Sequence, residues 1–298
     1  MIRQAGILLL AVVLLTGITL PASAQLADNL SSFDESTVQG YLKPLQETVG
    51  QALNTAFFTT AAIPERGFHA RLDLKLMSVF VKDSDRTFQA VTGGDFSPQQ
   101  RTETSTIFGP GNSATVTGDA NTQYTFPGGV DLGSLSLVVP QITIGAFKGT
   151  EAYVRWLAAG TNEPELGTVT TWGIGGRHSI SQYLGGPIDL AGAIFYQKLS
   201  AETDLLDVST FSIGAQASTD LLPFLRALGA LSYDSVSMST TYVKKTGAVD
   251  EPVTVDLDTA GSLHVSLGAF IGVGPVGLSI TGDLASHAGI SFNLGAGF

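Results

Sequence analysis

The feature that most constrains this sequence is a two-residue alternation of apolar and polar side chains, which returns from Gly67 to the last residue. In residues 68–76, Phe, Ala and Leu occupy one side of the alternation, while His, Arg, Asp and Lys occupy the other. This period describes a strand with one apolar face and one hydrated face. The pattern returns, more weakly in three segments, over 134–146, 149–158, 166–176, 187–198, 209–217, 225–243, 263–273, 276–284 and 288–298. Most segments are near the ~9–11 residues that a tilted strand needs to cross a bilayer.

The polar faces favour a membrane barrel over a secreted soluble sandwich, in which Leu72, Ile194 and Leu267 would meet in a dry core. Charged residues make up only 14% of the chain, and glycine reaches 35 residues. A sheet that faces water normally carries far more charge, whereas small polar residues suit an enclosed lumen. Since lipid leaves no backbone donor unpaired, such a sheet must close. Aromatic residues near the strand ends suit girdles at the lipid interfaces; they are Trp156, Tyr196, Phe292 and Phe298.

We therefore predict an all-β fold, an antiparallel transmembrane β-barrel of about ten strands over residues 67–298. The alternative is twelve strands, with Arg86–Val91 and Thr102–Phe108 as the extra pair, because a structureless loop over 82–133 would be unusually long. The remaining connections alternate in character. Short turns at 147–149, 177–186, 218–224 and 274–275 alternate with longer or more acidic connections at 82–133, 159–165, 199–206 and 244–260. Bacterial barrels keep short turns in the periplasm, so both chain termini are predicted there.

Two segments precede the strands. Residues 1–24 have the three parts of a cleaved secretory signal: Arg3, an apolar run from Ile7 to Leu20, and small residues at 22–24. A membrane-anchoring helix is the less favoured alternative, because the small-residue site ends the run. Residues 25–66 are predicted to form a helical segment, with Ser36 as N-cap and Gln39 completing a capping box. Pro44 and Gly50 are expected to break this segment into two helices.

Charge and composition exclude several classes of protein. The formal net charge is −11, which disfavours a nucleic-acid partner, because such binding depends on clustered Lys and Arg. The absence of cysteine excludes disulfides, thiolate metal sites and a cysteine nucleophile. Apolar residues at 44% exclude a disordered chain.

The signal, the serial strands and the terminal strand 289–298 resemble a bacterial outer-membrane β-barrel. A final Phe298 after alternating apolar positions resembles the signal that the barrel-assembly machinery reads. The resemblance implies a place in the bacterial outer membrane, with its lipids and the assembly machinery as partners. The helical segment is similar in layout to the hatch of long-chain fatty acid transporters (FadL-type), although their Asn-Pro-Ala motif is replaced by Asn-Thr-Ala at 54–56. Residues 41–45, 53–61 and 178–183 look like an uncharacterised outer-membrane barrel family of unknown function.

The candidate functional residues are the charged side chains on the predicted lumen face. They are His69, Arg71, Asp73, Lys75, Glu151, Arg155, Asp189, His264 and Asp283, with Asp234 beside them. Two interpretations stay open: a polar pathway or ligand site, and an ion-pair network that plugs a narrow bore. The second is favoured, because side chains can fill the interior of a barrel of ~8–10 strands. First and last strands are neighbours in a closed barrel, so Asp73 and Asn293 are expected to lie close together.

Chemical motifs are weak elsewhere. The run 178–181 sets His178 beside Ser179 and Ser181, as in lipid hydrolases that pair a serine with a histidine base, but a capped turn is the favoured interpretation. The acids between Asp250 and Asp258 lack the spacing of an EF-hand, so solvated surface charge is preferred. We therefore predict no enzyme activity, no metal and no cofactor.

Passage or binding of a small solute, with a hydrophobic ligand as one candidate, is the leading functional hypothesis. The alternative is a structural or interaction barrel with a plugged lumen and partner-binding loops at 82–133 and 244–260. A lipid-modifying enzyme embedded in the barrel ranks third.

Overall fold

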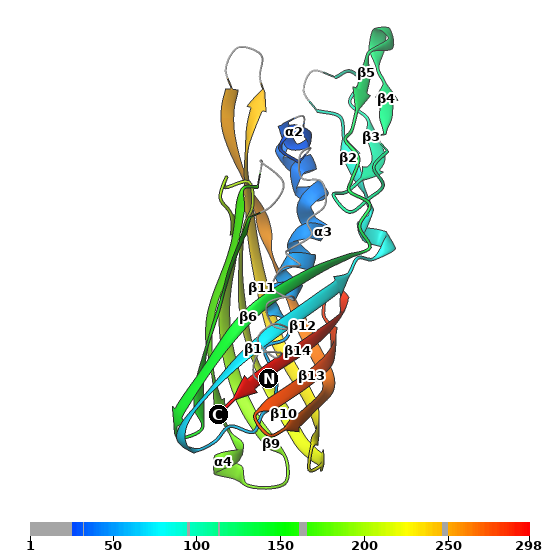
Figure 1. The fold of residues 1–298 in the computed structure, drawn as a ribbon. Coiled ribbons are helices and arrows are strands. Elements are labelled where there is room, and N and C mark those ends of the chain that lie inside the picture. The colour runs from blue at the N-terminus through cyan, green and yellow to red at the C-terminus, as the bar shows by residue number, and fades with distance from the viewer. Residues whose placement is uncertain (1–25, 32, 94–95, 113, 161–165, 246–249) are drawn as a thin grey trace, which may run out of the picture.

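The computed structural model describes residues 26–31, 33–93, 96–112, 114–160, 166–245 and 250–298, and these form a closed antiparallel barrel of ten strands (Figure 1). Around the barrel the order is β1-β14-β13-β12-β11-β10-β9-β8-β7-β6. The barrel strands are β1 Arg66–Phe80, β6 Ser134–Phe147, β7 Thr150–Gly160, β8 Thr168–Ser179, β9 Asp189–Ala201, β10 Asp207–Leu222, β11 Leu225–Lys245, β12 Asp250–Val273, β13 Val276–Leu284 and β14 Ala288–Gly297. The predicted fold class and the count of ten are confirmed.

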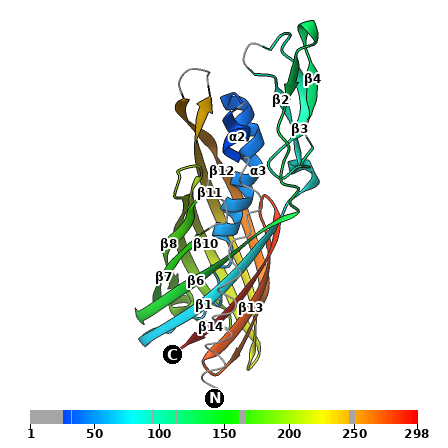
Figure 2. The same cartoon turned by 45° about the horizontal axis from the view of Figure 1, so that its top comes forward.

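The predicted alternative of twelve barrel strands is wrong. The first half of the extra pair, β2 (Thr87–Val91), bonds to β3 (Arg101–Ser105) and not to the barrel. The strands β4 (Thr115–Thr117) and β5 (Gln123–Thr125) form a second small sheet, and the short 3-10 turns Asp83–Asp85 and Asp119–Asn121 flank these elements. The two small sheets make an arm, formed by the described residues between 83 and 131, that rises beside one end of the barrel (Figures 1 and 2). We call this end, where the long connections lie, the loop end, and the opposite end, where the short turns lie, the turn end. These strands are too short to cross a bilayer.

The apolar face of the alternation points outward on the lower part of the barrel. Leu72 is 47% exposed, Ile194 is 49% exposed and Leu267 is 66% exposed, so the alternative of a sandwich with these residues in a dry core is wrong. Aromatic side chains lie exposed near both ends of the apolar band; they include Trp156, Trp172 and Tyr196 on one side and Phe68, Phe147 and Phe298 on the other. A closed sheet with an apolar outer band is the architecture of an outer-membrane barrel.

The apolar face of the wall changes from the outside to the inside partway along β11 and β12. Tyr233 faces outward, but Val236 and Met238, which follow it, are buried inside. Hydroxyl side chains take over the outer face, where Ser237 bonds to Thr259 at 2.9 Å. The lower wall is therefore apolar outside, as lipid requires, while the upper wall is built like a soluble protein, with its apolar side inward.

The upper wall corrects the predicted loop at 244–260, because most of this segment belongs to β12. Glu251, Asp256 and Asp258 are exposed on the strand. Their charges gave the segment the composition of a loop, although the alternation continues through Val255 and Leu257, which are buried. The acidic residues mark the part of the strand that lies beyond the apolar band.

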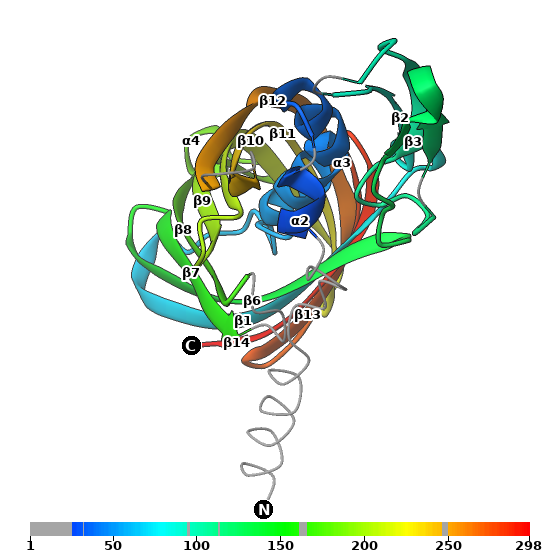
Figure 3. The same ribbon diagram turned by 90° about the horizontal axis from the view of Figure 1, so that it is seen from above.

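The helical N-terminal segment begins above the rim of the barrel and descends into the lumen (Figures 1 and 3). The short helix α2 (Leu26–Ser31) lies at the loop end and leads into α3 (Glu35–Asn54), whose N-cap is Asp34 rather than the predicted Ser36. Asp34 accepts a hydrogen bond from the Thr37 amide at 2.9 Å. None of the described helices is long and apolar enough to span a membrane.

The prediction of two helices is also wrong, because α3 continues through Pro44 and Gly50. Proline removes one backbone hydrogen bond, and glycine lowers helix propensity by about 1 kcal/mol. Burial inside the barrel outweighs these costs, since most helical stability in proteins comes from tertiary packing. At Gly50 the missing side chain is a requirement of the fold, because a Cβ there would lie 2.5 Å from Cγ2 of Val236.

The chain then descends irregularly from Thr55 to β1, and the barrel sheet begins at Arg66. Leu26 therefore lies at the loop end and Phe298 at the turn end (Figure 1), so the prediction of both termini at the turn end is wrong for the described start of the chain. The alternation of short turns with long connections locates only the ends of the barrel strands and gives no position for the segment that precedes β1. The predicted signal, residues 1–24, lies outside the described residues.

Candidate functional site in the barrel lumen

The lumen collects nearly all the charged residues predicted for it. Asp73, Lys75, Glu151, Arg155, Asp234, His264 and Asp283 are buried inside the barrel. His69 and Arg71 line the turn end, with side chains 17% and 21% exposed. Asp189 lies at the same end on β9, 3.6 Å from Arg226. As expected, β1 pairs with β14, which sets Lys75 opposite Asn293 and Asp73 opposite Gly295.

Arg155 holds the end of α3. Its Nε donates to Oε1 of Gln141 at 2.8 Å, and its two Nη atoms donate to the Thr55 carbonyl at 3.3 Å. Nη1 also reaches the Leu53 carbonyl at 3.3 Å. The guanidinium lies 4.1 Å from the ring centroid of Phe57, within the range of a cation–π contact. Arg155 is thus a cation supplied by the wall to the carbonyls at the C-terminal end of a helix, where the helix dipole favours positive charge.

A second anchor lies lower, at Thr60. Arg177 donates to the Thr60 carbonyl and, through Nε, to Glu151 at 2.5 Å. Arg226 donates to Oγ1 of Thr60 at 2.6 Å. His69 bonds to the other oxygen of Glu151 at 2.8 Å. The two arginines tie the irregular part of the luminal segment to β8 and β11.

Arg177 and Arg226 were missing from the predicted site. The pattern predicts a turn at 177–186 that includes Arg177, whereas β8 continues to Ser179. Extending the alternation by one step would have found it, because Thr171, Arg177 and Ser179 share the buried face. Arg226 is the second residue of the weakly patterned strand predicted at 225–243, on the same face as the buried Ser232 and Asp234.

His264 is the centre of a polar network on the opposite wall. Its Nδ1 lies 2.7 Å from Oδ2 of Asp234, and its Nε2 lies 3.3 Å from Oδ1 of Asp283. Hydroxyl groups donate further hydrogen bonds to both carboxylates: Ser212 and Ser232 donate to Asp234, and Ser266 and Thr281 donate to Asp283. The two carboxylates are therefore fully occupied by groups of this wall, as in the predicted ion-pair network.

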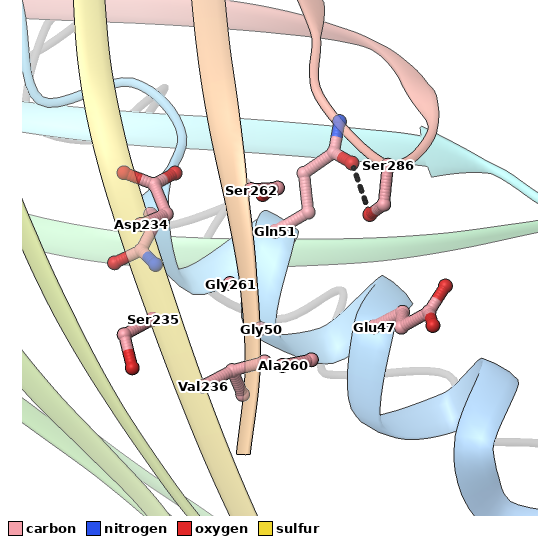
Figure 4. A pocket seen from close by; sticks show the side chains of 11 residues that line it. Glu47, Gly50, Gln51, Asp234, Ser235, Val236, Ala260, Gly261, Ser262 and Ser286 are labelled. Atoms are coloured by element: carbon pink, nitrogen blue, oxygen red, sulfur yellow. Dashed lines mark hydrogen bonds between the residues drawn. The ribbon is translucent and has the colours of Figure 1, made fainter.

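Two cavities contact luminal side chains. One of about 60 Å³ lies between α3 and strands β11 and β12, lined by Gly50, Gln51, Asn54 and Asp234 among others (Figure 4). In this view Oε1 of Gln51 points toward Ser286, whose hydroxyl donates to it at 3.2 Å. The other, of about 150 Å³, lies at the turn end. Both are smaller than the ~300–1,000 Å³ of sites for drug-sized ligands, whereas a cavity of about 360 Å³ beside Ser179 and Asp189 at the turn end reaches that range.

The run 178–181, for which a capped turn was the favoured prediction, does not form a serine–histidine pair. Within the described turn, His178 bonds to Thr150 at 2.8 Å and to Tyr183 at 3.0 Å. Ser179 and Ser181 bond to each other at 3.2 Å. The short helix α4 (Ser181–Leu184) carries one member of each group of contacts, Tyr183 and Ser181. Among the described residues, no group of three or more His, Asp or Glu side chains could hold a metal ion.

A family model described as "Family of unknown function (DUF6588)" matches residues 2–298. No curated protein matches the sequence.

Several solved structures are similar in outline. They include a loop-deleted variant of OmpT, an outer-membrane protein of Vibrio cholerae, with 12% identity, 78% of this chain and 97% of that chain covered, and a TM-score of 0.29. The translocator domain of the autotransporter NalP from Neisseria meningitidis has 13% identity, 93% and 99% coverage, and a TM-score of 0.29. The toluene transporter TbuX from Ralstonia pickettii has 13% identity, 83% and 93% coverage, and a TM-score of 0.29. At these scores the similarities carry no argument about function.

Proposed function

This chain belongs to the family of unknown function DUF6588, and we propose that it is a sealed outer-membrane barrel that holds a rigid interaction surface outside the membrane. The observation that carries the proposal is the apolar core shared by α3, the arm and the upper barrel wall. A core of this kind closes the bore and fixes the arm at the same time.

The seal depends on the packing of α3 against the upper wall. Five aliphatic side chains of the helix are buried in this core; they are Val38, Leu42, Leu45, Val49 and Leu53. Burying each contributes about 1.5–3 kcal/mol, which sums to on the order of 10 kcal/mol as an upper estimate. Such a helix leaves the lumen too rarely to act as an ordinary gate, and this favours the plugged alternative over free passage.

The arm is fixed to the same helix. The Tyr41 hydroxyl donates to the Gly128 carbonyl at 3.1 Å, and the Ile107 amide donates to the Tyr41 carbonyl at 3.2 Å. Phe33 packs against Phe126, with ring centroids 6.5 Å apart. A loop that only joined two strands would need none of these contacts. Their presence supports a role in which the arm presents a defined surface to a partner.

Conductance tests the seal. The full mature chain, inserted into planar bilayers, is expected to pass no steady ion current. Deleting residues 26–58 is expected to open a conductance, which would show that the barrel itself is wide enough. A steady current through the wild-type protein would contradict the proposal.

Surface labelling tests the position of the arm. Because the chain has no cysteine, Thr117→Cys on the arm and Gln182→Cys at the turn end introduce single thiols. A membrane-impermeant maleimide applied to intact cells is expected to label the first and not the second. The reverse result would place the arm in the periplasm and refute the proposed interaction surface.

Passage of a small solute is the second candidate function. The charged lower lumen and the cavity of about 150 Å³ at the turn end favour it, because a permanently closed plug has no need of a polar approach. This role requires α3 to move. Solute uptake into wild-type proteoliposomes, with a further increase when Arg155 is replaced by Met, would support passage over the sealed barrel.

A further inference from the structure

The inner faces of β1 and β14 carry a cluster of buried polar atoms without hydrogen-bond partners. Lys75 is 0% exposed, Asn293 is 2% exposed, and the two residues are direct cross-strand partners. The Lys75 ammonium, both polar side-chain atoms of Asn293 and Oδ2 of Asp73 have no hydrogen-bond partner among the described residues. Burying a polar group without a partner is costly, and more so when the group is charged, so this concentration indicates a ligand.

The charges around the cluster indicate the sign of the ligand. Lys75 interacts electrostatically with one carboxylate, Asp73, and with three cations, Arg71, Arg155 and Arg177. Asp73 is already paired with Arg71 at 2.6 Å, and Arg177 is paired with Glu151.

Two cations are then left without a carboxylate. Arg155 makes its hydrogen bonds to amide and carbonyl oxygens and to a thioether sulfur, and Lys75 makes none. Asp234 and Asp283, on β11 and β13, are engaged by His264 and four hydroxyl groups. Arg71, Lys75, Arg155 and Arg177 set against Asp73 and Glu151 therefore leave a formal excess of two positive charges in this group, which is costly in a buried setting unless an anion is present.

We propose that Lys75 and Asn293 bind a small inorganic anion of the halide class inside the barrel. The ammonium supplies the charge, and the Asn293 amide supplies a second donor from the neighbouring strand. A small monoanion fits best, because the surrounding lumen is filled by the N-terminal segment. The site goes beyond the proposed surface role and does not depend on passage through the barrel.

The approach to the site lies at the turn end. The cavity of about 150 Å³ there is lined by Arg71 and Arg177, together with Glu151. Arg71 precedes Lys75 by four residues on the same face of β1, which corresponds to about 13 Å along the strand. Arginine side chains at the entrance of a low-dielectric cleft raise the local concentration of anions.

Bromide is the direct probe of this site. Crystals of the wild-type protein grown or soaked in sodium bromide are expected to show an anomalous peak between the Lys75 ammonium and the Asn293 amide. The peak should be lost in Lys75→Met, which keeps much of the side-chain length without the charge. It should remain in Lys198→Met, a matched variant of a partly exposed lysine paired with Asp207 at 2.7 Å.

Thermal unfolding gives an independent measurement on the same proteins. Chloride is expected to raise the unfolding temperature of the wild type by a few degrees over sodium gluconate at equal ionic strength, because gluconate is too large to enter. This difference should vanish in Lys75→Met or, if that variant fails to fold, in Asn293→Leu. Water density alone at the site, or equal unfolding temperatures of the wild type in both salts, would overturn the proposal.

Discussion

Replacing Arg155 with Met should release the lower end of α3 while leaving the ring of barrel strands intact. The guanidinium is fully buried, and it joins the carbonyls of Leu53 and Thr55 to the wall residue Gln141. Methionine is nearly as long and fills much of the same space. The variant therefore removes the donors and the charge without opening a large cavity.

The expected effect is a local destabilisation of about 3 kcal/mol. Each charged hydrogen bond contributes about 1.5–3 kcal/mol, and a desolvated cation–π contact, here with Phe57, adds about 2 kcal/mol. Relief of the desolvation of a buried cation, several kcal/mol, offsets part of this sum. At 1.4 kcal/mol for each factor of ten, a 3 kcal/mol loss makes local opening about 150-fold more frequent.

Hydrogen exchange measured by mass spectrometry on the protein in lipid vesicles reports this opening residue range by residue range. Peptides covering 51–55 should exchange about 150-fold faster, while peptides from β9 and β13 should be unchanged. Arg86→Met, which removes a surface pair with Asp131, is the control and should leave 51–55 unaffected. Unchanged exchange at 51–55, or equal acceleration throughout the strands, would refute the role assigned to Arg155.

Four further outcomes are expected. Leu267→Arg on the lipid-facing band should cost about 2–4 kcal/mol in urea unfolding from vesicles, whereas Ser237→Arg on the upper wall should cost about 0–1 kcal/mol; equal costs would contradict the assigned reversal of sidedness. His264→Ala should cost about 3–5 kcal/mol in the same assay, because it leaves buried carboxylates uncompensated, and a change below 1 kcal/mol would show that the network is dispensable. Gly50→Leu should destabilise by about 1–3 kcal/mol through overpacking, and a stabilised variant would mean that the helix does not sit against the wall. Deleting Phe298 should lower the fraction of heat-modifiable, membrane-inserted protein in cells; unaffected insertion would remove it as an assembly signal.

The barrel could be predicted because a period of two fixes the face of every side chain once one face is assigned to lipid. This is why the period alone assigns Asp73, Arg155 and Asp283 to the lumen face, and the structure buries all three. The same rule failed at 244–260, where exposed acids suggested a loop although buried Val255 and Leu257 continued the alternation. Local composition was given more weight there than the period.

The contacts that organise the lumen could not be predicted, because they join residues that are far apart in sequence. Arg155 and Thr55 are 100 positions apart, and no spacing rule relates a strand residue to a helix end inside the barrel. The unbroken α3 was missed for a similar reason. Pro44 and Gly50 are judged by local propensity in a sequence, whereas in the structure their cost is met by the walls around them.

The position of α3 has a consequence for how the molecule is made. The helix precedes β1 in the chain, and β1 pairs with β14 to complete the ring. The N-terminal residues therefore lie inside a ring that the C-terminal strand closes. Inserting α3 into a barrel that had already closed would require the helix to unwind and to expose its apolar side chains to the polar lumen. The geometry therefore sets the order of events: α3 is placed first, and β1 then pairs with β14 around it.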